Sequence, residues 1–363
     1  MKKILFGAAI ASMMLASCGS EPSYQINGTT TEDIPEGSTV YLRNVNGELL
    51  DSALVQNNVF QFSGRQDEPI MRYVSYMVNN RAKKNVFMIL ENGAIQVQMS
   101  KEGLDASGTE NNNAFYACKK QADEVGKKVV RLMRETRKEN VTAEELKQLK
   151  EQIEQVKEER KNVMAQALAT HITTPVGAAL VMNNFTEPFP AEEQMKWMQQ
   201  IPQEYRNERI EKKMNYAKAL LASAVGQKFV DFTMKDMDGK DVKLADIVAK
   251  NKLTLVDFWA SWCGPCRGEM PNVVKAYKNY HMKGLEIVGV SLDDKADRWK
   301  NAVEQLGMTW IQLSDLKSWS CEGAQLYAVR GIPATVLINQ EGTIVARDLR
   351  GDALDAKLEE LLK

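Results

Sequence analysis

Between residues 24 and 110 the apolar positions alternate with polar ones, as at Phe60 and Phe62. Alternation with a period of two is the signal of strands that bury one face. Turn-forming residues recur at roughly ten-residue intervals, and one pair, Asn92-Gly93, is typical of a tight turn. The pattern predicts a small antiparallel β domain, a sandwich or a barrel.

The spacing changes to that of helices over residues 111–223. Thr142 and Glu145 form the sequence pattern of a capping box, which predicts the start of a long helix. The apolar residues that follow at three- and four-residue steps are Leu146, Leu149, Ile153, Val156 and Val163. Arg160 interrupts this narrow stripe. We favour an intramolecular hairpin with residues 125–133, and the alternative is a homodimer through a coiled coil of this region.

Strand and helix patterns alternate over residues 224–363, which predicts an α/β domain. Its clearest strand is the apolar run 252–260, KLTLVDFWA, which reads as a strand buried on both faces. Cys263 and Cys266 follow at once, where the strand gives way to a helix. Two cysteines at this spacing can close a reversible disulfide ring, and the first would stand at a helix N-terminus, which favours its thiolate. The thiolate is the nucleophile of disulfide exchange.

Composition excludes several other kinds of site. The 363 residues carry a formal charge of −1, which gives no long-range attraction to nucleic acid. Two histidines, His171 and His281, argue against a histidine-rich metal site or a Ser-His-Asp enzyme. No second Cys-x-x-Cys pair accompanies Cys263 and Cys266 to complete a zinc site. We therefore expect neither a metal nor a cofactor.

The N-terminal residues read as an export signal. Two lysines, an apolar run and small residues lead to Cys18, so residues 1–17 form a removable leader. The sequence before Cys18 resembles the lipobox of bacterial lipoproteins, whose cysteine carries the lipid anchor. Residues 18–23 then form a short linker. An ordinary secretory signal with a chance cysteine is the alternative. This segment predicts a protein tethered in the cell envelope and facing the periplasm.

The segment 256–266, VDFWASWCGPC, resembles the active-site strand and loop of thioredoxin. Residues 331–335, GIPAT, resemble the cis-proline loop of that fold, and Pro271 falls where its active-site helix is kinked. The run CRGEMP is more similar to the membrane-tethered TlpA/ResA branch. The resemblance covers residues 224–363. The preceding β region weakly resembles a domain of unknown function that stands in front of envelope thioredoxins.

The resemblance implies a role for each matching position. Cys263 matches the attacking, more exposed cysteine, and Cys266 matches the cysteine that resolves the mixed disulfide. Asp257 matches the buried carboxylate that takes the proton of the resolving thiol, and burial is expected to raise its pKa. Pro333 matches the cis-proline that faces the two sulfurs. The residues expected to contact substrate are Trp262, Gly264, Pro265 and Ile332, whereas Trp259 is expected to pack in the core.

The function implied is a thiol–disulfide oxidoreductase that reduces disulfides of envelope proteins, among which apocytochromes c are candidates. The Gly264-Pro265 dipeptide resembles that of reducing thioredoxins. A membrane electron donor of the CcdA/DsbD type would regenerate the dithiol. Two alternatives stand beside it: a redox-sensing adaptor that binds an envelope partner, and a peroxiredoxin-like peroxidase. Against the peroxidase, Ala260 stands at the position where peroxiredoxins carry a threonine.

Three further residues have no settled role. Cys118 and Cys321 depart from the family pattern and could pair, or remain free as buried thiols. Glu269 is expected to be a solvated or substrate-facing helix residue.

Overall fold

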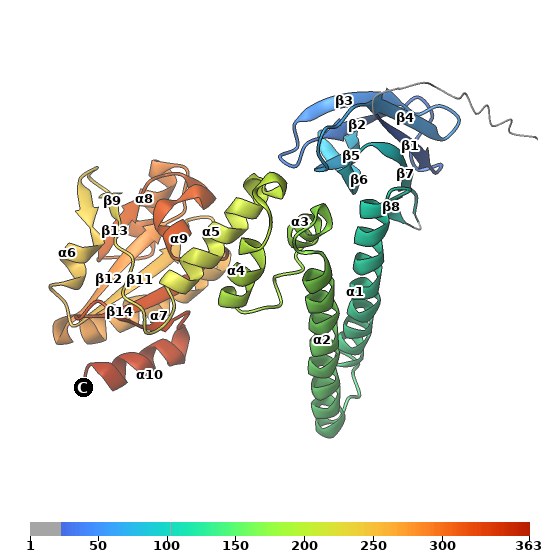
Figure 1. The fold of residues 1–363 in the computed structure, drawn as a ribbon. Coiled ribbons are helices and arrows are strands. Elements are labelled where there is room, and N and C mark those ends of the chain that lie inside the picture. The colour runs from blue at the N-terminus through green and yellow to red at the C-terminus, as the bar shows by residue number, and fades with distance from the viewer. Residues whose placement is uncertain (1–22, 102) are drawn as a thin grey trace, which may run out of the picture. The chain divides into compact units, whose positions relative to one another are not determined.

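The computed structural model describes residues 23–101 and 103–363, and the chain divides into two compact units (Figure 1). The first unit ends at Phe185 and also takes Ile201–Tyr205. The second consists of Thr186–Gln200 and Arg206–Lys363. The helical region predicted over residues 111–223 is therefore divided, since its last two α-helices belong to the second unit. The predicted leader and Cys18 lie outside the described residues.

Two four-stranded sheets form the β part of the first unit. Its strands are β1 (Tyr24–Thr30), β2 (Thr39–Arg43), β3 (Leu49–Leu54), β4 (Val59–Gly64), β5 (Ile70–Val78), β6 (Arg81–Leu90), β7 (Gly93–Met99) and β8 (Leu104–Ser107). The sheet orders are β4-β1-β7-β8 and β3-β2-β5-β6. Ile26, Val40 and Ile95 belong to their shared core and are fully buried. The predicted β domain is confirmed, with one parallel pair, β1 and β7.

The Asn92-Gly93 turn joins the two sheets and does not close a hairpin. β6 ends at Leu90 in one sheet and β7 begins at Gly93 in the other. Gly93 has a φ of +130°, a backbone conformation that favours glycine. The turn was therefore predicted correctly, but β6 and β7, which it joins, do not pair with each other.

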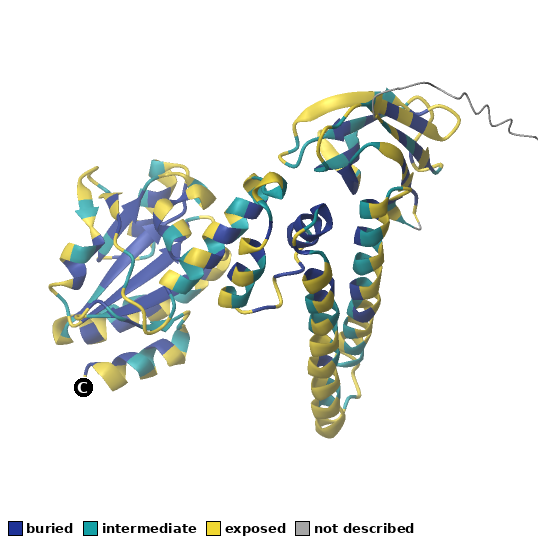
Figure 2. Cartoon of the chain, viewed as in Figure 1, coloured by how far each residue is buried: buried dark blue, intermediate teal, exposed yellow. Residues whose placement is uncertain are grey.

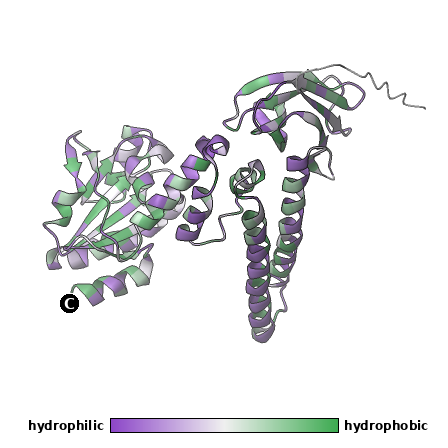
Figure 3. Cartoon of the chain, viewed as in Figure 1, coloured by the Kyte–Doolittle hydropathy of each residue, from purple (hydrophilic) through white to green (hydrophobic). Residues whose placement is uncertain are grey.

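Helices α1 (Glu110–Glu135), α2 (Ala143–His171) and α3 (Pro175–Met182) complete the first unit. Helices α1 and α2 pack against each other as a hairpin with a largely hydrophilic surface (Figure 3). The predicted capping box is present, because the Glu145 N–H donates to Thr142 Oγ1 at 3.3 Å and Glu145 Oε2 accepts the Thr142 N–H at 2.9 Å. Arg160, which interrupts the stripe, donates from Nε to the Ala122 carbonyl at 3.2 Å.

The second unit begins with α4 (Ala191–Gln199) and α5 (Glu208–Ala222). An α/β domain follows, with strands β9 (Thr233–Asp236), β10 (Asp241–Lys243), β11 (Leu253–Trp259), β12 (Leu285–Ser291), β13 (Ile311–Ser314), β14 (Ala334–Asn339) and β15 (Ile344–Arg347). Its helices are α6 (Leu244–Val248), α7 (Gly264–Tyr280), α8 (Ala296–Gln305), α9 (Glu322–Leu326) and α10 (Gly351–Leu361). Short 3₁₀ turns cover Gln203–Tyr205 in the first unit, and His281–Lys283 and Ser318–Ser320 in the second.

The sheet of the second unit has the order β10-β9-β13-β12-β11-β14-β15. β11 runs parallel to β12 and antiparallel to β14, and all of its residues are buried (Figure 2). A strand buried on both faces needs apolar residues at consecutive positions, which explains its sequence, LTLVDFW. Pro271 lies inside α7, as predicted. Over the described residues, none of the helices combines the length and apolarity needed to span a bilayer.

Candidate active site

The two cysteines of the Cys-Gly-Pro-Cys motif form a disulfide at the junction of β11 and α7. Their sulfurs are bonded, and their Cα atoms lie 5.3 Å apart. Cys263 is the N-cap residue of α7, and its Sγ accepts the backbone N–H of Cys266 at 3.2 Å. Proline fits the first turn of a helix because the N–H that it lacks would have no partner there. The motif therefore starts the helix and places a sulfur against its unpaired N–H groups.

The surface around the disulfide is open although the sulfurs are largely covered. Cys263 is 5% exposed and Cys266 is 2% exposed, so the expected difference in exposure is small in the disulfide form. Gly264 and Pro265 are exposed. Trp262 keeps 48% of its surface exposed.

The loop before β14 closes one side of the disulfide. The Ile332–Pro333 peptide is cis, and the Ile332 carbonyl oxygen lies 3.6 Å from Cys263 Sγ. Pro333 is buried, and its carbonyl accepts a hydrogen bond from the Arg350 guanidinium. The structure thus brings Ile332 and Pro333 to the cysteines, although they are distant in sequence.

Asp257 lies near the end of β11 and is 2% exposed. Its pKa is raised to about 7, mainly by burial and also by the nearby negative charge of Glu269, while Arg350 acts in the opposite direction. A carboxyl group with a pKa near neutrality can both accept and release a proton at the working pH. This is the direction of shift that was predicted from burial.

Glu269, which we expected to be solvated or to face a substrate, is partly buried and hydrogen-bonded within the chain. Its Oε1 accepts the backbone N–H of Gly351 at 2.7 Å, and its Oε2 accepts Nδ2 of Asn272 at 3.2 Å. Glu269 thus binds the N-terminus of α10, where unpaired N–H groups favour a negative charge. No local sequence signal could have shown this, because Glu269 and Gly351 are 82 residues apart.

A second carboxylate, which the sequence analysis missed, holds the loop before Cys263. Asp293 is buried and accepts the Ser261 N–H at 2.9 Å and the Ser261 hydroxyl at 2.5 Å. The Ser291 hydroxyl donates to the same carboxylate at 2.7 Å. Trp259, by contrast, packs in the core as predicted and donates from Nε1 to Gln312 Oε1 at 3.1 Å.

Among the residues that the structure describes, the two cysteines outside the motif, Cys118 and Cys321, are free thiols. Cys118 lies in α1 and is partly buried. Cys321 is fully buried and stands directly before α9. Burial raises the pKa of the Cys321 thiol to about 11.

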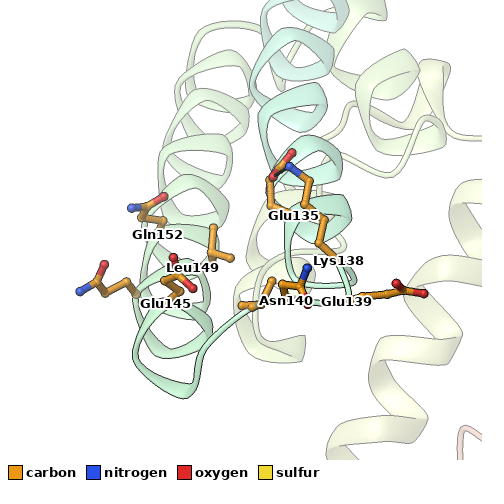
Figure 4. Close-up of a pocket in the computed structure, with 9 residues that line it drawn as sticks. Glu135, Lys138, Glu139, Asn140, Glu145, Leu149 and Gln152 are labelled. Carbon is orange, nitrogen blue, oxygen red and sulfur yellow. Dashed lines mark ion pairs between the residues drawn. The ribbon is translucent and has the colours of Figure 1, made fainter.

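A cavity of about 650 Å³ lies at the tip of the α1–α2 hairpin (Figure 4). Charged and amide side chains line most of it, with Leu149 and Val141 as its apolar members. Its lining includes neither cysteine nor histidine, and Glu135 and Lys138 pair with each other there. Within the described ranges we find no group of three or more histidine, cysteine or acidic residues arranged to hold a metal ion.

Comparison with known proteins gives two family matches. Residues 225–347 match the AhpC/TSA family, and residues 24–115 match a domain of unknown function, DUF4369. The crystal structure of the thioredoxin domain of a thiol-disulfide oxidoreductase from Bacteroides vulgatus is 36% identical in sequence, with a TM-score of 0.36. That likeness covers 39% of this chain and 99% of the other.

Curated relatives match the same C-terminal part. The thiol-disulfide oxidoreductase ResA of Bacillus thuringiensis subsp. konkukian is 31% identical over 139 residues, which are 38% of this chain and 77% of the relative. ResA of Bacillus anthracis is 32% identical over the same shares. Together with the cysteine pair of the motif, this similarity shows that the chain belongs to the ResA-type family of thioredoxin-like thiol-disulfide oxidoreductases.

Proposed function

We propose that this oxidoreductase reduces protein disulfides in the cell envelope, from a lipid anchor at Cys18. The thiolate of reduced Cys263 attacks one sulfur of a substrate disulfide, a new S–S bond forms, and the other substrate sulfur leaves as a thiolate that takes up a proton. The Cys266 thiol loses its proton to Asp257 and attacks Cys263 Sγ. The second substrate thiolate then leaves, and two electrons have passed from the dithiol to the substrate.

The placement of Cys263 at the N-cap of α7 is the observation that carries the proposal. The N–H of Cys266 already reaches Cys263 Sγ at 3.2 Å, and α7 is 17 residues long. N–H groups at a helix N-terminus stabilise a thiolate through hydrogen bonding and through the helix dipole. The attacking group would therefore be ionised at neutral pH, as disulfide exchange requires.

Asp257 supports the resolving step. Its carboxyl group is buried, and its pKa is raised to about 7. It would accept the proton of the Cys266 thiol when that thiol attacks and release it afterwards. By contrast, the buried Ala260, three residues before Cys263, has no hydroxyl group with which to bind a peroxide.

The reducing direction rests on the Gly264-Pro265 dipeptide, which resembles that of reducing thioredoxins. By this analogy the reduction potential lies nearer to about −270 mV than to the about −120 mV of a strong oxidant. A membrane electron donor of the CcdA/DsbD type would return Cys263 and Cys266 to the dithiol. Equilibration with defined thiol–disulfide buffers measures the potential, and a value near −120 mV would contradict a reducing role.

Insulin reduction tests the proposed activity. The mature protein is compared with Cys263→Ser, Cys266→Ser and the control Cys321→Ser, each supplied with dithiothreitol. We expect the first two variants to lose the activity above the background of the reductant, and the control to keep it. Equal activity in the protein and all three variants would overturn the mechanism. Peroxide consumption is followed in parallel and is expected to stay at background.

Membrane attachment is tested separately, by expressing the full chain and Cys18→Ala in a bacterial host. We expect metabolic labelling with a radioactive fatty acid, and recovery with the membranes, for the full chain only. Labelling of Cys18→Ala, or export of the unchanged chain without lipid, would contradict the anchor.

A further inference from the structure

Two tryptophans with large exposed surfaces lie side by side next to the disulfide. Trp262 directly precedes Cys263, and its ring centroid is 6.1 Å from that of Trp319. The two side chains are 48% and 47% exposed. Exposed aromatic pairs are costly in a free protein and are frequent anchors at binding surfaces.

Trp319 is also one wall of a groove of about 470 Å³ in the second unit. The other residues that line this groove, which we call the α5 groove, are Lys212, Asn215, Tyr216, Gln325, Ala328, Val329 and Arg330. Helix α5 supplies one side, and α9 with the following loop supplies the other. Helix α5 ends before residue 225, where the AhpC/TSA match begins. The groove therefore depends on a helix outside that matched segment.

Arg330 brings a positive charge to the groove. Its guanidinium lies over the ring of Tyr216, 3.3 Å from the centroid, and in the part of the chain that the structure describes no ion pair involves it. An arginine stacked on a ring keeps the N–H groups at its edge available, and these match the geometry of a carboxylate.

The two lysines of α5 near Arg330 have acidic partners. Lys212 pairs with Glu208 at 2.6 Å, and Lys213 pairs with Glu187 at 3.2 Å. Burial lowers the pKa of Lys213, Glu187 acts in the opposite direction, and the charges of Arg330 and Arg209 add to the lowering. Arg330 is thus close enough to influence a neighbouring charge, and its own positive charge attracts anionic groups.

Two residues of the α5 groove, Trp319 and Arg330, connect it to the surroundings of the disulfide. Trp319 contacts Trp262, the neighbour of Cys263. Arg330 precedes Ile332 by two residues, and the Ile332 carbonyl lies 3.6 Å from Cys263 Sγ. Two residues of chain span at most about 7 Å. A polypeptide bound along this loop, with its sulfur at Cys263, would therefore place a residue close to the cysteine within reach of Arg330.

We propose that the α5 groove binds acidic side chains close to the reactive cysteine of an extended polypeptide substrate, and so selects acidic segments among protein disulfides. The inference rests on the proposed function, whose substrate class it narrows. Trp262 and Trp319 would cover the apolar part of the segment, and Arg330 would bind a carboxylate.

Three disulfide-bridged peptides of equal length test this inference, with glutamate, glutamine or lysine at the positions next to the cysteine. The value of kcat/KM is measured at low and at high salt with the reduced protein, with Arg330→Glu and with Lys250→Glu. Lys250 is an exposed lysine of the same unit that follows α6 and precedes β11, whereas the cysteines follow the other end of that strand. Both variants change the net charge equally.

We expect the protein to prefer the glutamate peptide over the lysine peptide by about tenfold at low salt, which corresponds to about 1.4 kcal/mol. High salt should reduce this ratio because it screens exposed charges. Arg330→Glu should abolish or reverse the ratio, and Lys250→Glu should retain it. Equal rates for all three peptides, or an unchanged ratio in Arg330→Glu, would overturn the inference.

The neutral disulfide of 2-mercaptoethanol separates this failure from a failure of the proposed function. If the protein reduces it and insulin but shows no charge preference among the peptides, only the α5 groove inference falls. If the protein reduces none of these substrates, the proposed function falls as well.

Discussion

Cys263 and Cys321 both stand directly before a helix, yet their surroundings differ. Cys263 precedes the 17-residue α7, accepts an N–H from Cys266 and borders an open surface. Cys321 precedes the five-residue α9 and is fully buried. N–H groups near Cys321 favour its thiolate, but burial outweighs them and raises its pKa to about 11. A helix N-terminus therefore gives a reactive thiol only where the sulfur can also meet water or a substrate.

Removing Cys263 gives the largest expected effect. Cys263→Ser should lower the rate of peptide disulfide reduction by about 10³-fold or more, because no other thiol of the second unit has this environment. Cys321→Ala should change the rate by less than about twofold and lower the free energy of unfolding by about 1 kcal/mol. Stopped-flow assays and urea unfolding measure the two quantities. A loss of activity in Cys321→Ala with its fold intact would contradict the comparison.

Asp257→Asn tests the proton acceptor. At pH 7 we expect the resolving step to slow by about 10²-fold, the usual contribution of a general base. In the wild-type protein this step should accelerate as the pH rises through about 7, because the carboxylate forms there. Asp257→Asn should lack that inflection, and the exposed Asp246→Asn serves as the control. An unchanged pH profile in Asp257→Asn would remove Asp257 from the mechanism.

Asp257 should also make stability depend on pH. Its pKa is higher in the folded protein than the ordinary value, so the folded state binds more protons between about pH 4 and 7. The stabilisation is present below about pH 4 and is lost as the pH rises through about 7. Relative to Asp257→Asn, the free energy of unfolding of the wild-type protein should fall over this interval. Parallel pH dependence in both proteins would contradict the raised pKa.

The smallest expected effect is at the N-cap of α2, which serves to stabilise a helix, whereas the N-cap of α7 is the reactive Cys263. Thr142 caps α2 through an ordinary hydroxyl, with Glu145 completing the capping box. Thr142→Ala should destabilise the hairpin by about 1 kcal/mol. Thr142→Ser should keep most of the stability, because serine retains the capping hydroxyl group. Peptide reduction should stay unchanged in both. A rate that follows the stability of this hairpin would show that the hairpin takes part in the reaction.

The features that could be predicted from the sequence are those that depend on a short run of consecutive residues. The seven buried residues of β11, the cysteine pair after it and the capping box at Thr142 are each contained in a few consecutive residues. Strand β3, with the sequence LLDSAL, gives no alternating signal, because it is an edge strand whose residues are mostly exposed.

Contacts between distant residues were not predictable in this way. Glu269 binds Gly351, Asp293 binds Ser261, and Arg330 stacks on Tyr216, each across at least 32 residues. Such pairs depend on how helices and loops pack, and no local pattern marks them. The cysteines were therefore found from sequence, whereas the groups that position them and the α5 groove required the structure.

Alkylation of the reduced protein by iodoacetamide, followed for each cysteine by mass spectrometry between about pH 5 and 10, tests the central claim most directly. We predict that Cys263 reacts fastest and reaches half of its maximal rate below the pH of about 8.5 typical of a free thiol, while Cys321 stays unmodified in the folded protein. A Cys263 that reacts only above about pH 9, or a Cys321 that reacts first, would contradict the account.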